Sequence, residues 1–376
     1  MAVFGLRNEF ELHKDVKDAT MHQEQSTGKP RPRVSAAQVA RACGVSTATV
    51  SYVFNGKPGV SPVVRRHVIE TANELGYRSP LTAAKHNRSL TRVVGLIVPS
   101  MLNYMHMHWA QAIIDAAAEE GFDVFVSTTG DDPERLAHVA ASMAARNVDG
   151  VISTGGMRLD ARIHGTLGAA RIPVVNLSRT VEHADASFIG IDDAQAASEL
   201  MGHVLGHGVT KVATVIGPRF STASATREAA FIDTAAAHGV PIPGRWRVST
   251  RLHRGGGRIA AEELLADHDD RPEAIVCGSD EVALGVIEHA VVNGIDIPGE
   301  LIVVGSDGLA RSRSPLLGLT TIVQPVVEMA TTAFRILLER ITEPGTPART
   351  VICPHQLHIG TSCGCHPEDF NALTAR

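Results

Sequence analysis

Two short helices joined by a glycine turn constrain this chain more than any other feature, and the sequence places them between Val34 and Asn55. Ser35 with Gln38 three residues later has the spacing of a capping box, which begins a helix. Gly44 predicts its end, because glycine adopts a left-handed conformation at little cost. The apolar face expected between these ends consists of Val39, Ala40 and Cys43. The pattern predicts a first helix that packs on one side.

Ser46 predicts the cap of a second helix. Its inward positions are Val50, Val53 and Phe54, and its opposite face carries Thr47, Ala48, Ser51 and Tyr52. The major groove of DNA admits one α-helix, and two short helices across a tight turn are typical of proteins that insert the second helix there. The sequence therefore predicts a helix-turn-helix with its second helix free for DNA.

The charge distribution supports this interpretation. The whole chain of 376 residues has a formal net charge of -5, which argues against general affinity for polyanions. Between Lys29 and Arg92, however, the acidic residues are only Glu70 and Glu74. The basic ones are Lys29, Arg31, Arg33, Arg41, Lys57, Arg65, Arg66, Arg78, Lys85, Arg88 and Arg92. This excess indicates contact with a phosphate backbone, and a solvated basic face is the plainer alternative.

A third helix is expected from Val63 to Leu75, opened by Ser61-Pro62. Its expected inward residues are Val64, Val68, Ile69, Ala72 and Leu75. We expect a disordered extension over residues 1–32, an all-α DNA-binding domain over 33–78 and a hinge linker over 79–92.

The motif V-S-T-A-T-V-S-Y-V-F-N at Val45–Asn55, with Val60–Ser61, Arg65–Arg66 and Glu74–Tyr77, resembles the DNA-binding headpiece of the lactose/galactose-repressor (LacI/GalR) family. The resemblance continues to about Thr361. It implies a transcriptional regulator whose contacts with base edges come from Thr47, Ala48 and Tyr52. It assigns Ser46, Ser51, Asn55, Ser61 and Arg65 to phosphates, and Ser35 to the same DNA-binding surface.

The linker departs from the family pattern. Family members fold this segment as a hinge helix, in which a leucine wedges into the minor groove and kinks the duplex. The corresponding position here is His86, and the first leucine after it is Leu90. Either the hinge shifts its register to use Leu90, or the kink is weaker or absent.

From Val93 onward, short apolar runs alternate with helical segments of 10 to 15 residues. This alternation predicts α/β architecture with parallel sheets wound on both faces. Two such halves resemble the periplasmic-binding-protein-like core of the family, with two lobes around a ligand cleft over residues 93–362. The chain is expected to cross between lobes near Asp192, near Pro325 and, as an open alternative, once more. Residues 363–376 are expected to form a solvent-facing tail.

Ligands of open α/β sheets bind beyond the carboxyl ends of the strands. The polar residues expected there include Asn103, Ser153, Arg179, Asp192, Asp193, Ser279, Asp280 and Asp307, with Arg227 on a following helix. Capping the next helix is the alternative role of Asp192 and Asp280.

The resemblance implies that Arg227 and Phe231, four residues apart, contact the effector together with Asp307 and either Asp192 or Asp193. It assigns Gln324 to the interface between the lobes. Arginine and carboxylate groups suit neighbouring hydroxyls, so the expected effector is a sugar or a related small polar metabolite. The loop from Asn103 departs from the family's usual residues. The departure indicates either an effector other than an ordinary hexose or packing of Met105 and Trp109 into the lobe core.

Two groups of metal-binding residue types occur without a standard motif. His203 and His207 have i, i+4 spacing but lack the glutamate of zincin helices, and Cys363 and Cys365 are spaced more tightly than a C-x2-C knuckle. We expect no metal and no cofactor.

Gly255–Gly257 is expected to be a flexible loop rather than an anion cradle. Phosphate-loop, hydrolase and dinucleotide motifs are missing, so the sequence does not predict an enzyme.

These features predict a homodimeric, ligand-responsive regulator, most simply a repressor, that binds a palindromic operator in double-stranded DNA. The chain shows no secretion signal and no run of 18 apolar residues, and its five cysteines suit a reducing compartment, so a cytoplasmic protein without membrane contact is expected. Two alternatives stay open. One is a DNA-binding regulator with a vestigial cleft, and the other is a solute-binding protein.

Overall fold

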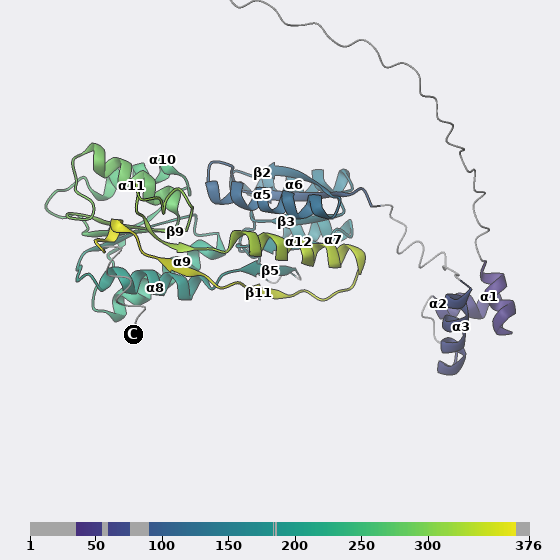
Figure 1. Ribbon diagram of the computed structural model, residues 1–376. Coiled ribbons are helices and arrows are strands. Elements are labelled where there is room, and N and C mark those ends of the chain that lie inside the picture. Colours follow the sequence, from purple (N-terminus) through teal and green to yellow (C-terminus); the bar gives the residue numbers. More distant parts are fainter. Residues whose placement is uncertain (1–34, 55–58, 76–89, 183, 185, 366–376) are drawn as a thin grey trace, which may run out of the picture. The chain divides into compact units, whose positions relative to one another are not determined.

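The computed structural model describes residues 35–54, 59–75, 90–182, 184 and 186–365 (Figure 1). The chain divides into two compact units, residues 1–88 and 89–376, and each is described by itself. Among the described residues, no helix combines the length and the apolar character that a bilayer crossing requires.

The first unit contains the three expected helices: α1 (Ala36–Cys43), α2 (Thr47–Phe54) and α3 (Pro62–Glu74). Both halves of the capping box are formed, because the Gln38 N–H donates to Ser35 Oγ at 3.4 Å and the Ser35 N–H donates to Gln38 Oε1 at 2.7 Å. Gly44 ends α1 with φ of 67°. The sequence prediction for this turn is confirmed.

A small core holds these helices together. Its buried members are Val39, Ala40, Val50, Val53, Val68 and Ala72. Ile69 and Leu75 were expected here, but both are 40% exposed, so that prediction is wrong. The helix repeat explains the error for Ile69, which directly follows the buried Val68 and therefore points about 100° away from it. The side chain of Phe54 lies outside the described set.

The second unit contains two six-stranded sheets, each forming the centre of one lobe. The first sheet has the order β11-β5-β4-β3-β1-β2, and its paired strands are all parallel. Its strands are β1 (Val93–Val98), β2 (Asp123–Thr128), β3 (Gly150–Ser153), β4 (Val174–Leu177), β5 (Ser187–Gly190) and β11 (Thr350–Ile352). The helices of this lobe are α5 (Tyr104–Glu119), α6 (Pro133–Ala145), α7 (Arg162–Ala169) and α12 (Val326–Thr342).

The second sheet has the order β12-β10-β9-β8-β6-β7. Its strands are β6 (Val212–Ile216), β7 (Arg247–Ser249), β8 (Ala274–Cys277), β9 (Ile302–Asp307), β10 (Thr320–Val323) and β12 (Gln356–His358). Its helices are α8 (Asp193–Leu205), α9 (Thr222–Ala237), α10 (Arg254–Leu264) and α11 (Asp280–Val292), with short 3-10 turns η1 (Gly244–Trp246) and η2 (Thr361–Cys363). Strand β12 runs antiparallel to β10, which the alternating pattern did not predict.

The chain passes between the lobes three times. It leaves the first sheet after β5 near Asp192, returns after β10 near Pro325, and leaves again between β11 and β12, at residues 353–355. The two expected crossings are confirmed, and the third, left open by the sequence, exists. Connections of this kind between two lobes are where hinge motions occur in two-lobed binding proteins.

The Gly255–Gly257 segment is helical rather than a flexible loop, because α10 begins at Arg254. Gly257 of α10 and Gly285 of α11 permit close packing between the two helices. A Cβ on Gly257 would lie 2.1 Å from the Val282 carbonyl oxygen, and one on Gly285 would lie 2.1 Å from the Arg254 carbonyl oxygen. Glycine therefore serves here as a contact surface between two helices.

The end of the described chain also differs from expectation. Cys363 is 1% exposed and Cys365 is half-buried, so the chain remains packed against the second lobe up to residue 365. The expectation of a solvent-facing tail is wrong for these residues.

Candidate functional site

The outer face of α2 carries the candidate base-reading side chains. Thr47, Ala48, Ser51 and Tyr52 are all exposed, and Tyr52 is 45% exposed. Buried Val50 and Val53 hold the opposite face of the helix in the core. The helix thus presents a row of side chains outward, as the sequence predicted. Asn55 and His86 lie outside the described residues.

The candidate phosphate-contacting residues also build the helices. Ser46 Oγ accepts from the Thr49 N–H at 3.0 Å, and Ser61 Oγ accepts from the Val64 N–H at 3.3 Å. Arg65 donates from Nη1 to the Val53 carbonyl oxygen at 3.0 Å, which ties α3 to the end of α2. A helix N-terminus also favours a nearby phosphate, so a structural role and a DNA contact are compatible at these serines.

At the carboxyl edge of the second sheet, an enclosed ion pair forms the centre of the candidate effector site. Arg227 Nε lies 2.7 Å from Asp193 Oδ1, and Arg227 Nη1 donates to the Gly278 carbonyl oxygen at 2.9 Å. Burial raises the pKa of Asp193, against the opposing effect of Arg227. Burial disfavours the charge on Arg227, but Asp193 and Asp307 outweigh it and raise its pKa. Arg227 is therefore a cation held among carboxyl groups.

Asp307 and Gln324 lie beside this pair and retain hydrogen-bonding capacity. Gln324 Nε2 donates to Asp307 Oδ1 at 3.2 Å. The remaining oxygens, Asp307 Oδ2 and Gln324 Oε1, are buried without a hydrogen-bond partner. Burial, reinforced by Asp280, raises the pKa of Asp307 well above its ordinary value. Because unpaired buried oxygens are costly, the pair is suited to receive hydroxyl donors from a ligand.

Ser279 and Asp280 have different roles from those the sequence suggested. Ser279 is the cap of α11 and accepts from the Val282 N–H at 3.3 Å. Asp280 accepts from Thr321 Oγ1 at 2.5 Å and from the Leu309 N–H at 2.8 Å. Burial raises the pKa of Asp280 to about 6. Asp280 therefore fixes the loop behind Asp307 and is not the helix cap.

The facing edge of the first sheet holds a second buried group. Arg179 Nη1 lies 2.6 Å from Asp131 Oδ1, and His106 Nδ1 lies 2.7 Å from the Ser100 carbonyl oxygen. Burial and the nearby Arg179 lower the pKa of His106 to about 4, which keeps its imidazole neutral. The sequence indicated Arg179 but missed Asp131 and His106. The predicted Asn103 and Ser153 are buried close to their own loops, where each accepts from a backbone N–H two residues ahead.

Two predicted effector contacts do not reach this site. Phe231 is fully buried in the core, because it lies one turn beyond Arg227 on α9 and faces the sheet. Asp192 is exposed and accepts from the Gln195 N–H at 2.9 Å as the cap of α8. Of the two acids, Asp193 is the one that pairs with Arg227, and Phe231 packs in the core.

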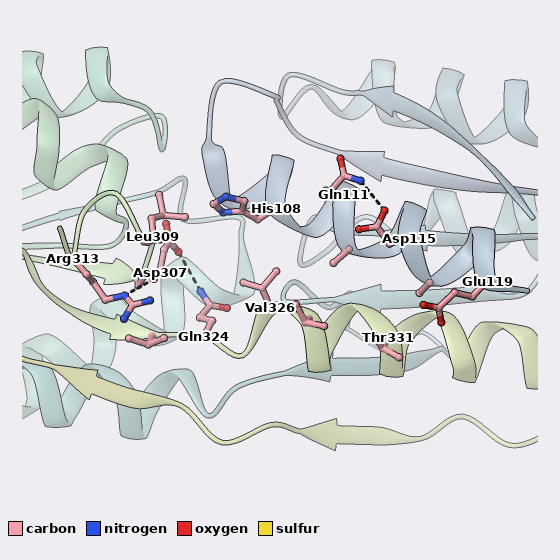
Figure 2. Close-up of a pocket in the computed structure, with 16 residues that line it drawn as sticks. His108, Gln111, Asp115, Glu119, Asp307, Leu309, Arg313, Gln324, Val326 and Thr331 are labelled. Carbon is pink, nitrogen blue, oxygen red and sulfur yellow. Dashed lines mark hydrogen bonds between the residues drawn. The ribbon is translucent and has the colours of Figure 1, made fainter.

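A pocket of about 460 Å³ lies between the lobes and borders the buried group (Figure 2). Asp307 and Gln324 line it from the second lobe, while His108, Gln111 and Asp115 line it from α5. Arg227 and Asp193 are not among its lining residues. The pocket thus borders Asp307 and Gln324, whose unpartnered oxygens are buried, and does not border the ion pair. Sequence spacing did not indicate the α5 residues.

Tyr104 and Arg311 connect the lobes near this pocket. The Arg311 guanidinium carbon lies 3.4 Å from the Tyr104 ring centroid, and Arg311 also pairs with the buried Glu281. Tyr104 begins α5 in the loop that departs from the family pattern. The altered loop therefore supplies a cation–π contact between the lobes.

Comparison with known proteins places these features in one family. Residues 37–79 match the family model described as bacterial regulatory proteins, lacI family, and residues 201–363 match a periplasmic binding protein-like domain. The chain is 30% identical to catabolite control protein A of Priestia megaterium, over 86% of this chain and 97% of that protein. The chain belongs to the LacI family. It is a DNA-binding transcriptional regulator of that family.

Other LacI-family relatives agree. The HTH-type transcriptional regulator MalR of Streptomyces coelicolor is 32% identical, over 83% of this chain and 91% of that protein. Two solved structures share the fold: the regulator CelR in complex with cellobiose (TM-score 0.65, 24% identity, 88% and 100% of the two chains) and the lac repressor dimer bound to operator (TM-score 0.64, 22% identity, 88% and 99%). The expected two-domain architecture is confirmed.

Proposed function

We propose that this LacI-family protein is a cytoplasmic, homodimeric repressor without enzymatic activity. It binds a near-palindromic operator and responds to a sugar or a related polyhydroxylated metabolite held between the lobes. The observation that carries the effector half is the pair of buried, unpartnered oxygens, Asp307 Oδ2 and Gln324 Oε1, at the border of the inter-lobe pocket.

The exposed face of α2 supports the DNA-binding half. Thr47 and Ala48 carry methyl groups suited to thymine, and Tyr52 offers a ring and a hydroxyl to base edges. Arg65, Ser46 and the other candidate phosphate contacts would set the register of the helix in the groove. Because a homodimer has two-fold symmetry, two such headpieces require two half-sites of opposite orientation.

The chemistry of the buried group supports the effector class. Neighbouring hydroxyls of a polyol can donate to Asp307 and Gln324, and a site built to bond hydroxyls rejects molecules that lack them. The pocket volume lies within the usual range for small-molecule sites. Related regulators have been solved with cellobiose and with D-xylulofuranose, which supports a carbohydrate without identifying it.

Contacts between the lobes supply the element that an effector can bias. Arg158 donates its N–H to the Phe220 carbonyl oxygen at 2.9 Å, and the Thr180 N–H donates to Thr222 Oγ1 at 2.9 Å. The Tyr104–Arg311 contact lies on the pocket side. An effector that binds one lobe arrangement more tightly by a few kcal/mol shifts the population of that arrangement and, through it, DNA affinity.

Two measurements on the full-length chain test the proposal. Thermal shift against a panel of sugars and nucleosides should raise the Tm with one sugar class, and Asp307→Ala should abolish that rise. Selection from random duplexes, followed by fluorescence anisotropy, should recover a symmetric sequence whose affinity falls steeply with salt. Symmetric DNA binding without any ligand response would favour the regulator with a vestigial cleft. Failure to prefer any symmetric duplex would overturn the proposal.

A further inference from the structure

Two histidines and two cysteines, separated by about 160 residues in sequence, meet on the second lobe. His203 lies in the last turn of α8 and His207 one turn beyond, so both imidazoles lie on the same side. Cys363 ends η2, and Cys365 follows two residues later. One ligand atom of each residue lies within 4.8 Å of the other three. Neither pair is a metal motif alone, and the fold joins them.

Four of the six distances among these atoms are close to the edges of a coordination tetrahedron, and all six are within 4.8 Å. The two Nε2 atoms are 3.4 Å apart, and His203 Nε2 lies 3.3 Å from Cys363 Sγ. Cys365 Sγ lies 4.0 Å from His203 Nε2 and 3.7 Å from His207 Nε2. With zinc–nitrogen bonds of about 2.0–2.1 Å and zinc–sulfur bonds of about 2.3 Å, tetrahedral edges are roughly 3.4 Å between nitrogens and roughly 3.6–3.8 Å when sulfur is included.

The donor set selects a class of ion. Two thiolates with two imidazoles suit zinc and chemically similar ions, whereas magnesium and calcium prefer oxygen ligands. Four protein ligands complete a tetrahedron, which is the arrangement of a structural site rather than a catalytic one. Cys363 is buried and His207 is exposed, so an ion can enter from the His207 side.

The surroundings support the ligand positions. Thr320 Oγ1 donates to Cys363 Sγ at 3.0 Å, and the Gly360 N–H donates to Thr320 Oγ1 at 2.9 Å. Hydrogen bonds of this kind orient a thiolate ligand. Thr320 begins β10, whose other end leads to Gln324, and α8 begins at Asp193. Both elements that hold the cluster therefore also reach the candidate effector site.

We propose that this protein binds one zinc-class divalent ion per chain through His203 Nε2, His207 Nε2, Cys363 Sγ and Cys365 Sγ. The ion fastens the segment from η2 to Cys365 onto the end of α8. Both thiols lose their protons on binding, and both imidazoles bind in the neutral form. This inference is independent of the DNA-binding function, because it rests only on the geometry of the second lobe.

Cobalt(II) is a direct probe, because Co²⁺ replaces zinc in tetrahedral sites and its thiolate complexes absorb in the visible and near-ultraviolet. Titration of reduced, metal-free full-length chain should produce thiolate charge-transfer and tetrahedral ligand-field bands that saturate at one equivalent and disappear when Zn²⁺ is added. His207→Ala and Cys365→Ser change exposed or half-buried side chains. Each should weaken Co²⁺ binding by more than roughly 10- to 100-fold, which is the cost of losing a hydrogen-bond partner that only orients a metal ligand.

His238→Ala and Cys43→Ser are matched controls, since they remove a histidine and a cysteine outside the cluster. Both should retain the bands. Circular dichroism of the metal-free variants checks folding. If a cluster variant does not fold, the unchanged chain gives a second test. Zn²⁺ should then protect Cys363 and Cys365 from alkylation, as measured by mass spectrometry.

Several results would overturn the proposal: no bands, bands unchanged in both cluster variants, or cysteines alkylated equally with and without Zn²⁺. A Cys363–Cys365 disulfide that persists in the reductant-treated chain would do so as well, because a disulfide leaves no thiolate for an ion.

Discussion

Asp193 Oδ1 accepts from Arg227 Nε at 2.7 Å, with the side chains only 11% and 8% exposed. The pair joins the first turn of α8 to α9 directly behind the candidate effector oxygens. Removing one member leaves the other as an uncompensated buried charge, which costs far more than the pair itself contributes.

Arg227→Ala should therefore lower the free energy of unfolding by about 3–5 kcal/mol and abolish the ligand-dependent rise in Tm. Arg254→Ala is the control, because Arg254 pairs with Glu288 at 2.9 Å and the two side chains are 44% and 43% exposed. Its loss should change stability by about 0–1 kcal/mol. Urea unfolding of both variants measures the difference. If both variants lost the same small amount of unfolding free energy, the buried pair would not carry the desolvation cost expected of buried charges.

The headpiece makes a separate prediction about DNA. Tyr52→Ala should change the ranking of operator variants by about 1–3 kcal/mol at the positions it reads. Arg65→Ala should instead weaken every sequence alike and reduce the slope of log affinity against log salt by about one. Because Arg65 also holds the Val53 carbonyl, its variant should melt earlier. Anisotropy titrations over operator variants and salt concentrations separate the two roles, and identical profiles would contradict the division.

Much of this architecture was predictable because it depends on local rules. The capping box of Ser35, the left-handed Gly44 and most strand positions follow from side-chain spacing, and the structure has them. The antiparallel β12 was not predictable, because three residues are too few to establish a strand pattern and its direction is set by the last return to the second lobe.

The candidate site was predictable only in part. Residues at strand ends could be identified from the rule for open sheets, and Arg227, Asp193 and Asp307 do lie together. The rule could not separate Asp193 from Asp192, since one residue along a helix start decides which carboxylate turns inward. The sequence analysis also missed contacts between residues that are distant in sequence. These are Tyr104 with Arg311, and the histidine pair with the cysteine pair. Sequence spacing says nothing about partners from distant segments.

The buried acids predict an unusual pH dependence. Burial raises the pKa of Asp280 from the ordinary 3.8 to about 6, and burial with Asp280 raises that of Asp307 well above its ordinary value. Above about pH 4 the folded chain therefore binds more protons than the unfolded chain, so these groups lower the free energy of unfolding as pH rises through that window. The decline due to Asp280 should end near pH 6, and Asp307 should extend it upward.

Asp307→Asn should flatten the upper part of this decline, because the amide keeps an oxygen for Gln324 but does not titrate. Asp115→Asn, at an exposed pocket residue, should leave the decline unchanged. Urea unfolding across the pH range gives the comparison directly. A slope that Asp307→Asn does not alter would mean that another group carries the proton.

The packing of α10 on α11 gives the last prediction. A Cβ at Gly257 would meet the Val282 carbonyl oxygen at 2.1 Å, so Gly257→Ala must push the two helices apart or distort one of them. Overpacking of this kind costs about 1–3 kcal/mol. Gly165, inside α7, has no atom within 4 Å of the corresponding position. Gly165→Ala should stabilise the chain by about 0.5–1 kcal/mol, because alanine loses less backbone freedom on folding.

Both variants add one methyl group inside a helix, and they differ in what surrounds that group. If urea unfolding shows a lower free energy of unfolding for Gly257→Ala and a higher one for Gly165→Ala, close helix contact rather than helix propensity explains the glycine at position 257. Stabilisation by both would show that α10 and α11 have room to accept a methyl group. In that case the glycines would reflect some property of the segment other than the distance between the helices.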